Sequence, residues 1–158
     1  LADETFCNDR SISSGTGYKI DTTTFYGSYN RNRDKRSPSL KCAQDNDKFK
    51  MSNESVKLDY PISLITADEV SMAGGVWNTS NSNYYLYNGQ YFWTLSPSSF
   101  NSSNSLARVW SVFPSGSLDT WFDVTNSIGA RPVINLKANT QITKGDGTAL
   151  NPYTVTIN

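Results

Sequence analysis

The chain has 158 residues, of which 37% are hydrophobic and 18% are charged, and its formal net charge is zero. This length suits one domain with a substantial core, and the lack of net charge argues against steering toward nucleic acid. No apolar run reaches the roughly 18 residues that a membrane span needs, so we expect no direct insertion into a membrane. Residues 1–5 (LADET) lack the basic start and apolar core of a signal peptide. Abundant Ser, Thr, Asn, Gly and Tyr residues favour an extracellular, β-rich protein.

The chain contains two cysteines, Cys7 and Cys42, and no histidine. An isolated, widely spaced pair in a chain of extracellular composition predicts a structural disulfide, which would stabilise the fold by about 3–4 kcal/mol. Two buried free thiols are the alternative. Without histidine or a cysteine cluster we expect no metal site and no cofactor, and a catalytic triad would lack its usual base.

The first half of the chain offers one predicted strand and two polar connections. Residues 22–29 are β-branched and aromatic, which predicts a strand. The basic run 31–41 (RNRDKRSPSLK) is interpreted as a solvated loop rather than an anion or nucleic-acid site, because no aromatic residue interleaves with its charges. Residues 45–54 (DNDKFKMSNE) are interpreted as a polar connection rather than a calcium loop, since Phe49 occupies a ligand position and no glycine follows.

A strand followed by a short helix is predicted next. Residues 60–65 (YPISLI) read as a buried strand. Thr66 and Glu69 are spaced as a capping box, which predicts a helix over about residues 67–73. Gly74 or Gly75 can adopt the left-handed conformation that ends it.

The stretch 91–136 contains three of the four tryptophans and is expected to organise the fold. Residues 91–95 are predicted as a central strand that ends at Ser96-Pro97, and residues 130–134 as a core strand. Further on, Gly145-Asp146-Gly147-Thr148 predicts a turn, and residues 152–157 an edge strand.

Residues 107–113 and 118–124 predict a hairpin whose turn is residues 114–117 (PSGS). Because side chains alternate along a strand, each strand presents two sets of residues. The set predicted to line the outer face is Arg108, Trp110, Asp119, Trp121 and Asp123, and the set predicted to point inward is Val109, Leu118, Phe122 and Val124. Tryptophans flanked by charges are typical of a recognition surface. The alternative is that both faces are buried and the tryptophans belong to the core.

Seven segments of the chain resemble, in order, one known domain. They are residues 6–11 (FCNDRS), 37–42 (SPSLKC), 60–70 (YPISLITADEV), 73–75 (AGG), 91–97 (YFWTLSP), 129–136 (GARPVINL) and 145–148 (GDGT). The resemblance is to an uncharacterised C-terminal domain of Gram-positive gut bacterial surface proteins, which is similar to the C-type-lectin-like fold of the formylglycine-generating-enzyme type. It implies an α+β fold of mostly antiparallel strands and long loops, with one or two short helices. It also implies a single domain over 1–158 that lacks part of its N-terminal segment, at the bacterial cell surface or outside the cell.

The same fold carries the variable proteins of diversity-generating retroelements, in which a stretch before a closing glycine-arginine strand is rewritten at adenines. The matching stretch here is residues 98–125, followed by Gly129 and Arg131, and its Asn and Ser content agrees with adenine-rich codons. The stretch includes Phe100 and Asn101, which we add to the expected ligand-binding residues.

Two activities of similar folds do not carry over to this chain. Formylglycine-generating enzymes use a late pair of cysteines, whereas both cysteines here are early, and the Glu-Pro-Asn and Gln-Pro-Asp motifs of calcium-dependent lectins are absent. We therefore expect a non-catalytic ligand-binding or display domain whose partner is a protein or carbohydrate on another cell or host surface. The alternatives are a structural spacer or assembly module and, less favoured, an enzyme with a glycosidase-like carboxylate pair.

Overall fold

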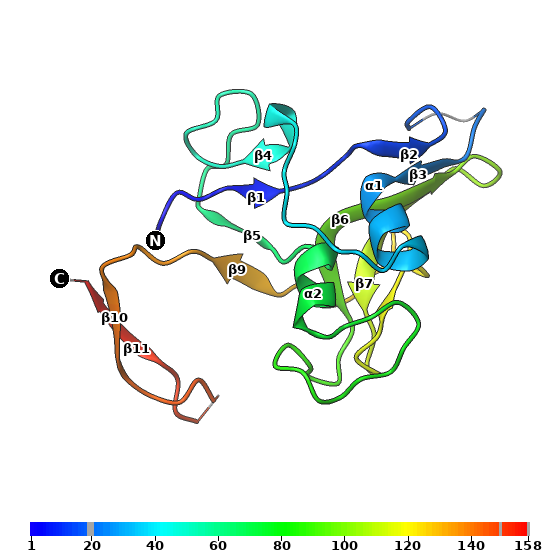
Figure 1. Cartoon of the computed structure of the whole chain (residues 1–158). Helices are drawn as coiled ribbons and strands as arrows, with labels where there is room; N and C mark the ends of the chain where they lie inside the picture. The colour runs from blue at the N-terminus through cyan, green and yellow to red at the C-terminus, as the bar shows by residue number, and fades with distance from the viewer. Residues whose placement is uncertain (19–20, 149, 158) are drawn as a thin grey trace.

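The computed structural model describes residues 1–18, 21–148 and 150–157 and has an α+β architecture of mostly antiparallel sheets with two short helices (Figure 1). The strands are β1 (Phe6–Cys7), β2 (Ile12–Ser14), β3 (Thr24–Tyr26), β4 (Lys48–Phe49), β5 (Ile62–Leu64), β6 (Phe92–Asn101), β7 (Leu106–Val112), β8 (Leu118–Asp119), β9 (Pro132–Ile134), β10 (Thr140–Lys144) and β11 (Thr154–Ile157). The helical elements are α1 (Gly27–Tyr29), the turns η1 (Asn30–Asp34) and η2 (Asp45–Asp47), and α2 (Ala67–Ala73). One five-stranded sheet has the order β2-β3-β6-β7-β8, and three pairs, β1-β4, β5-β9 and β10-β11, stand beside it.

Strand β6 lies at the centre of the five-stranded sheet, as its sequence predicts, but it does not end at Ser96-Pro97. Proline cannot donate to a ladder, so the pairing with β7 shifts register on both sides of Pro97. Side-chain hydroxyls satisfy the carbonyl groups of β7 in this region. The Thr94 hydroxyl donates to the Trp110 carbonyl at 2.9 Å, and the Ser98 hydroxyl donates to the Arg108 carbonyl at 3.0 Å. The irregularity therefore continues the strand instead of ending it.

Helix α2 has the predicted bounds and the predicted capping box. The Thr66 hydroxyl accepts from the Glu69 amide at 3.1 Å, while the Glu69 carboxylate accepts from the Thr66 amide at 2.7 Å. Gly74 ends the helix with a φ of 123°, a conformation that favours glycine.

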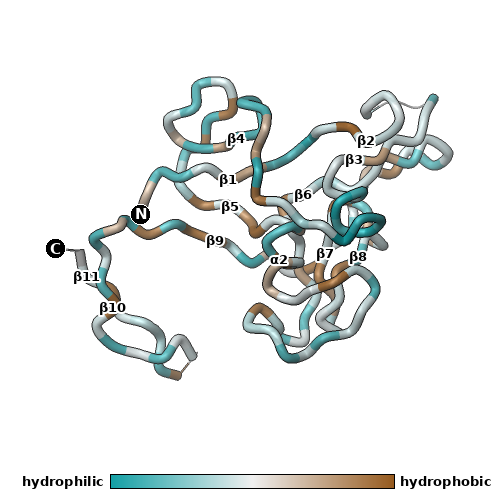
Figure 2. The backbone as a smooth tube through the Cα atoms, in the orientation of Figure 1, coloured by the Kyte–Doolittle hydropathy of each residue, from teal (hydrophilic) through white to brown (hydrophobic). Residues whose placement is uncertain are grey.

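The two strands predicted as buried, residues 60–65 and 130–134, are shorter and more exposed than expected. They form the pair β5-β9, in which Ile62 faces Ile134, outside the five-stranded sheet. Both strands are hydrophobic (Figure 2), yet their side chains are at most partly buried, and Val133 of β9 packs against the edge of the core. Ile65, just beyond β5, is buried in the core, and its carbonyl accepts from the Leu95 amide. The prediction of two core strands is wrong, because a short apolar run does not reveal whether both of its faces are covered.

Two other strands were predicted, over residues 22–29 and 152–157. The strand expected over residues 22–29 is limited to β3, because the chain turns into α1 at Gly27. The strand expected over residues 152–157 is confirmed as β11, which pairs with β10. Between β10 and β11, Gly145 and Gly147 have positive φ angles, as the predicted turn requires.

The core lies between α2, β6, β7 and β8 and is centred on Trp110, which is 0% exposed. The indole Nε1 of Trp110 donates to the Ser28 hydroxyl at 3.2 Å, and its ring meets Trp77 edge-on with centroids 5.5 Å apart. The predicted outward position of Trp110 is therefore wrong. In the observed register Val112 faces Leu118, so Trp110, Val112 and Leu118 share the core face, while Ser111 and Asp119 share the other.

Replacing Trp110 with alanine is expected to remove about 3–5 kcal/mol from the free energy of unfolding, because the cavity forms at the centre of the core. Urea unfolding followed by circular dichroism measures this loss. Trp110→Phe should cost less, since it keeps a ring in contact with Trp77. A Trp110→Ala variant as stable as the wild type would show that this indole is not in the core.

Candidate functional site

Trp121 is an exposed tryptophan held by buried neighbours. Its side chain is 73% exposed, whereas Leu118 and Thr120 just before it are buried. After it, the Asp123 carboxylate accepts from the Thr125 amide at 3.0 Å, and the Asp123 amide donates to the Asn126 side chain at 3.0 Å. The backbone on both sides of the indole is thus fixed, while the indole itself faces solvent, as the sequence predicts.

Four half-exposed rings pack together on the face of the sheet opposite Trp110. This aromatic cluster consists of Tyr91, Trp93, Phe113 and Phe122. Phe122 lies among the other three, with centroids 5.3 Å from Tyr91, 6.3 Å from Trp93 and 5.5 Å from Phe113. The predicted burial of Phe122 in the main core is wrong, and Val124 is also exposed. The cluster is a small second core that anchors the segment carrying Trp121.

Asp119 lies on the same face as the aromatic cluster. Trp93, Ser111 and Asp119 are consecutive cross-strand neighbours on β6, β7 and β8. Burial raises the pKa of the Asp119 carboxyl above its ordinary value, against the opposing effect of the backbone amides of Thr120 and Trp121 that donate to it. This row therefore places a half-buried acid beside an aromatic surface.

Arg108 and Asp123 are neighbours across the hairpin, as predicted, because an isolated bridge joins them beyond the end of β8. The pKa of Asp123 is lowered, mainly by hydrogen bonds from Thr125 and with a further contribution from the Arg108 charge. The Nε of Arg108 is buried and has no hydrogen-bond partner among the residues that the structure describes. The two residues form the polar border of the Trp121 segment.

Phe100 and Asn101 lie at the end of β6, where they pair with Ala107 and Leu106 of β7, and the Ala107 carbonyl in turn accepts from the Val124 amide. Phe100 is buried against the ring of Tyr18 at 4.5 Å, so the expectation that it contacts a ligand is wrong. The Asn101 side chain accepts from the Ser103 amide at 2.9 Å and shapes the β6–β7 turn. The structure thus pairs Arg108 with Asp123 next to Trp121 and places Asp119 beside the aromatic cluster. Trp110 and Phe100 are buried instead, and the Asn101 side chain is bound within its own turn.

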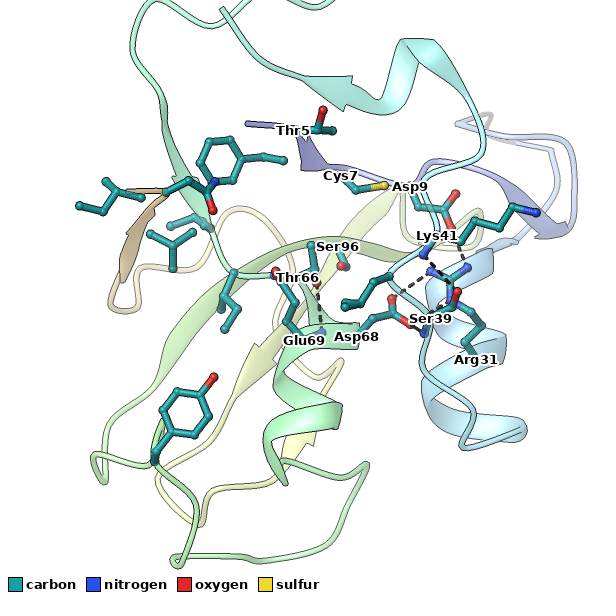
Figure 3. Close-up of a pocket in the computed structure, with 18 residues that line it drawn as sticks. Thr5, Cys7, Asp9, Arg31, Ser39, Lys41, Thr66, Asp68, Glu69 and Ser96 are labelled. Carbon is teal, nitrogen blue, oxygen red and sulfur yellow. Dashed lines mark hydrogen bonds and ion pairs between the residues drawn. The ribbon is translucent and has the colours of Figure 1, made fainter. Parts of the chain in front are cut away.

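A cavity of about 380 Å³ lies on the other side of the molecule (Figure 3). Its walls come from β1, the segment 39–41, the start of α2, and the pair β5-β9. Its lining includes the apolar residues Phe6, Leu64, Ile65 and Val133. The charged residues Asp9, Arg31 and Asp68 gather at one end (Figure 3).

Arg31 joins two carboxylates at the charged end of the cavity. Its Nε and one terminal nitrogen each lie 2.9 Å from an oxygen of Asp68, and its other terminal nitrogen lies 2.6 Å from Asp9. Asp68 is buried and also accepts from the Ser39 amide at 2.9 Å. The interpretation of residues 31–41 as a solvated loop is wrong at Arg31, because the partners of this residue are distant in sequence and carry no local signal.

The ion pairs shift the pKa values in the expected directions. The pKa of Arg31 is raised, chiefly by its hydrogen bonds to Asp68. Burial acts to raise the pKa of Asp9, but hydrogen bonds from Ser11 and the pairing with Arg31 outweigh it and leave the pKa lowered. Arg31 and Asp9 are therefore held in their charged forms, which suits a structural cluster rather than proton transfer.

The predicted disulfide between Cys7 and Cys42 is confirmed. It ties β1 to the segment after Pro38, and Cys7 lines the cavity next to the charged end. Within the described residues, no group of acidic or sulfur side chains is arranged to hold a metal ion. None of the described helices has the length and apolar character needed to cross a membrane.

No family model, curated protein or solved structure matches the chain significantly. The architecture itself is established as α+β with mostly antiparallel strands. The resemblance to a C-type-lectin-like domain therefore remains a proposal that rests on the sequence segments given above.

Replacing Arg31 with methionine is expected to lower the free energy of unfolding by about 3–5 kcal/mol, because the buried Asp68 loses its counter-ion. Adding Asp68→Asn to this variant should restore much of the loss, since the amide oxygen can still accept from Ser39. Arg33→Met is the matched control, because Arg33 stacks on Tyr29 and Trp77 at the surface, and should cost about 0.5–1 kcal/mol. Equal losses for Arg31→Met and Arg33→Met in chemical denaturation would contradict this role.

Asp119→Asn tests the raised pKa of Asp119 through the pH dependence of stability. When the pKa of a carboxyl group is higher in the folded than in the unfolded protein, the group stabilises the fold at pH values below its unfolded pKa. This stabilisation is lost as the pH rises through the pKa of the folded state. The variant should therefore match the wild type near about pH 3 and be the more stable protein near about pH 7. Thermal melts at both pH values measure the difference, and a wild type that is more stable at neutral pH would contradict the assignment.

Proposed function

We propose that this protein is a non-catalytic recognition domain that binds a protein or carbohydrate through the surface around Trp121. The observation that carries the proposal is the 73% exposure of an indole whose neighbours in sequence are buried or hydrogen-bonded. An exposed tryptophan on a fixed backbone loses little conformational entropy on binding. Tryptophans at such positions often supply a large share of binding energy.

The surroundings of Trp121 supply the other features of a recognition surface. The aromatic cluster beside it gives apolar area, and Arg108, Asp119 and Asp123 give charged groups at its border. Interfaces commonly combine an aromatic centre with a polar rim. The Trp121 segment also falls within residues 98–125, the stretch that would vary in a retroelement variable protein, so a variable ligand is part of this proposal.

The proposed setting is a bacterial surface protein with a C-type-lectin-like fold. Antiparallel sheets with two short helices and a disulfide support it, since disulfides persist in oxidising environments outside the cytosol. Catalysis is not part of the proposal, because Arg31 at the cavity is paired with Asp9 and Asp68. The Thr66 hydroxyl and the Glu69 carboxylate, which also line the cavity, bond to each other in the capping box of α2.

A structural spacer is the second candidate function. The burial of Trp110 favours it, since only one of the two hairpin tryptophans is left for recognition. A spacer would keep Trp121 for contact with a neighbouring domain rather than with a ligand.

Trp121→Ala is expected to change the free energy of unfolding by no more than about 0.5 kcal/mol and to cost about 2–4 kcal/mol of binding. Thermal melts measure the first effect, and binding to a printed panel of host glycans and immobilised mucins measures the second. Tyr85→Ala is the matched control, because Tyr85 is an aromatic residue with 81% exposure outside the Trp121 surface.

Phe122→Ala completes the comparison, since it removes a ring from the aromatic cluster and should cost about 1–3 kcal/mol of stability. If Trp121→Ala melts far below the wild type, or binds the panel as well as the wild type does, the recognition proposal fails. Absence of wild-type binding to every member of the panel would favour the spacer.

A further inference from the structure

The chain contains one Asn-Gly pair, Asn88-Gly89, in the connection between α2 and β6. This connection extends away from the sheets (Figure 1), and Asn88 is exposed. An asparagine followed by glycine can react with its own backbone, because the next amide nitrogen reaches the side-chain Cγ and glycine has no Cβ to hinder the approach. Whether the pair reacts in the folded protein depends on how the fold uses that nitrogen.

The Gly89 amide is available for this attack. It donates no hydrogen bond within the described parts of the chain, and Gly89 is partly exposed. The φ of Gly89 is 69°, and a Cβ built on it would meet only the Tyr87 hydroxyl, at 3.7 Å. Little therefore surrounds this turn, and water can reach the amide proton.

A second amide activates the Asn88 side chain. The Gln90 amide donates to the Oδ1 of Asn88 at 3.0 Å. Attack at Cγ places negative charge on this oxygen, and a donor that is already aimed at it stabilises the charge as it develops. The turn thus polarises the side-chain carbonyl and at the same time leaves the Gly89 nitrogen free.

The pair Asp146-Gly147 offers a comparison, and its geometry is the opposite. The Gly147 amide donates to the Asn151 carbonyl at 3.2 Å. Hydrogen bonds from Thr148 lower the pKa of the Asp146 carboxyl, which therefore stays a carboxylate and resists attack by a nitrogen. The nucleophile is thus occupied and the acceptor unreactive at this turn, whereas both are ready at Asn88.

We propose that Asn88 is a site of self-modification, at which the folded chain converts this asparagine into aspartate and isoaspartate. The Gly89 nitrogen gives its proton to hydroxide and bonds to Cγ, the bond from Cγ to Nδ2 breaks, and ammonia leaves with a proton from water. Water then opens the cyclic succinimide at either of its carbonyls, so the net reaction consumes water and releases ammonia. Both products add a carboxylate to a chain of zero net charge. The reaction does not depend on the proposed recognition function.

The test follows the 158-residue chain in mildly alkaline buffer, both folded and in urea. Chymotrypsin cleaves after Tyr87 and Tyr91, and mass spectrometry of the fragment 88–91 (NGQY) detects the replacement of an amide by an acid. A protein isoaspartate methyltransferase with S-adenosylmethionine detects the isoaspartate separately. The folded chain is expected to modify Asn88 at least as fast as the unfolded chain does, because the fold holds the Gln90 amide against Oδ1.

The fragment 78–84 (NTSNSNY) is the internal control, because it comes from the same connection and none of its three asparagines precedes a glycine. It should stay unmodified while the fragment 88–91 reacts. Asn88→Ser removes the reacting amide and should abolish methyl transfer, and thermal melts show that the variant is folded. A folded chain that reacts more slowly than the unfolded one overturns the proposal. So does equal modification of the two fragments, or methyl transfer that survives Asn88→Ser.

Discussion

The ion cluster of Arg31 with Asp9 and Asp68 joins three segments that are distant in sequence. No local sequence pattern in these segments predicts the contact. Asp9 follows β1, Arg31 lies in η1, and Asp68 lies in the first turn of α2. The Ser39 amide adds a fourth segment by donating to Asp68. Because Asp68 is buried, the fold tolerates its charge only while Arg31 is present, and the positions of η1 and α2 are therefore linked.

The disulfide acts on the same region through covalent chemistry. Cys7 and Asp9 are two residues apart, and Cys42 follows the segment that contains Ser39. The N-terminal strand is thus fixed to the segment after Pro38 by a covalent bond and to α2 by charge.

The opposite face of the sheet is held by aromatic packing rather than by ion pairs. There the aromatic cluster packs the chain after β8 onto β6 through ring contacts, and one half-exposed ring, Phe122, contacts the other three. Trp110 packs in the main core, and Phe122 packs in the aromatic cluster on the opposite face of the sheet. Trp121 belongs to neither and faces solvent. The exposure of Trp121 results from packing on both sides of the sheet.

The sequence alone was sufficient for features whose physical cause is local or covalent. The capping box between Thr66 and Glu69 acts over three residues and sets the start of α2. Two glycines with positive φ set the β10–β11 turn, and the single pair of cysteines could bond only with each other. The central place of β6 and the exposure of Trp121 also followed from pattern.

Tertiary structure decided the rest, because it depends on contacts between distant residues. The hairpin register next to its turn differs by one residue from the predicted register, and a shift of one residue exchanges the faces of a strand, so Trp110 entered the core. The partners of Arg31 lie 22 and 37 residues away and left no local pattern. The burial of β5 and β9 depended on what covers each face, which hydrophobicity along a single short strand does not encode.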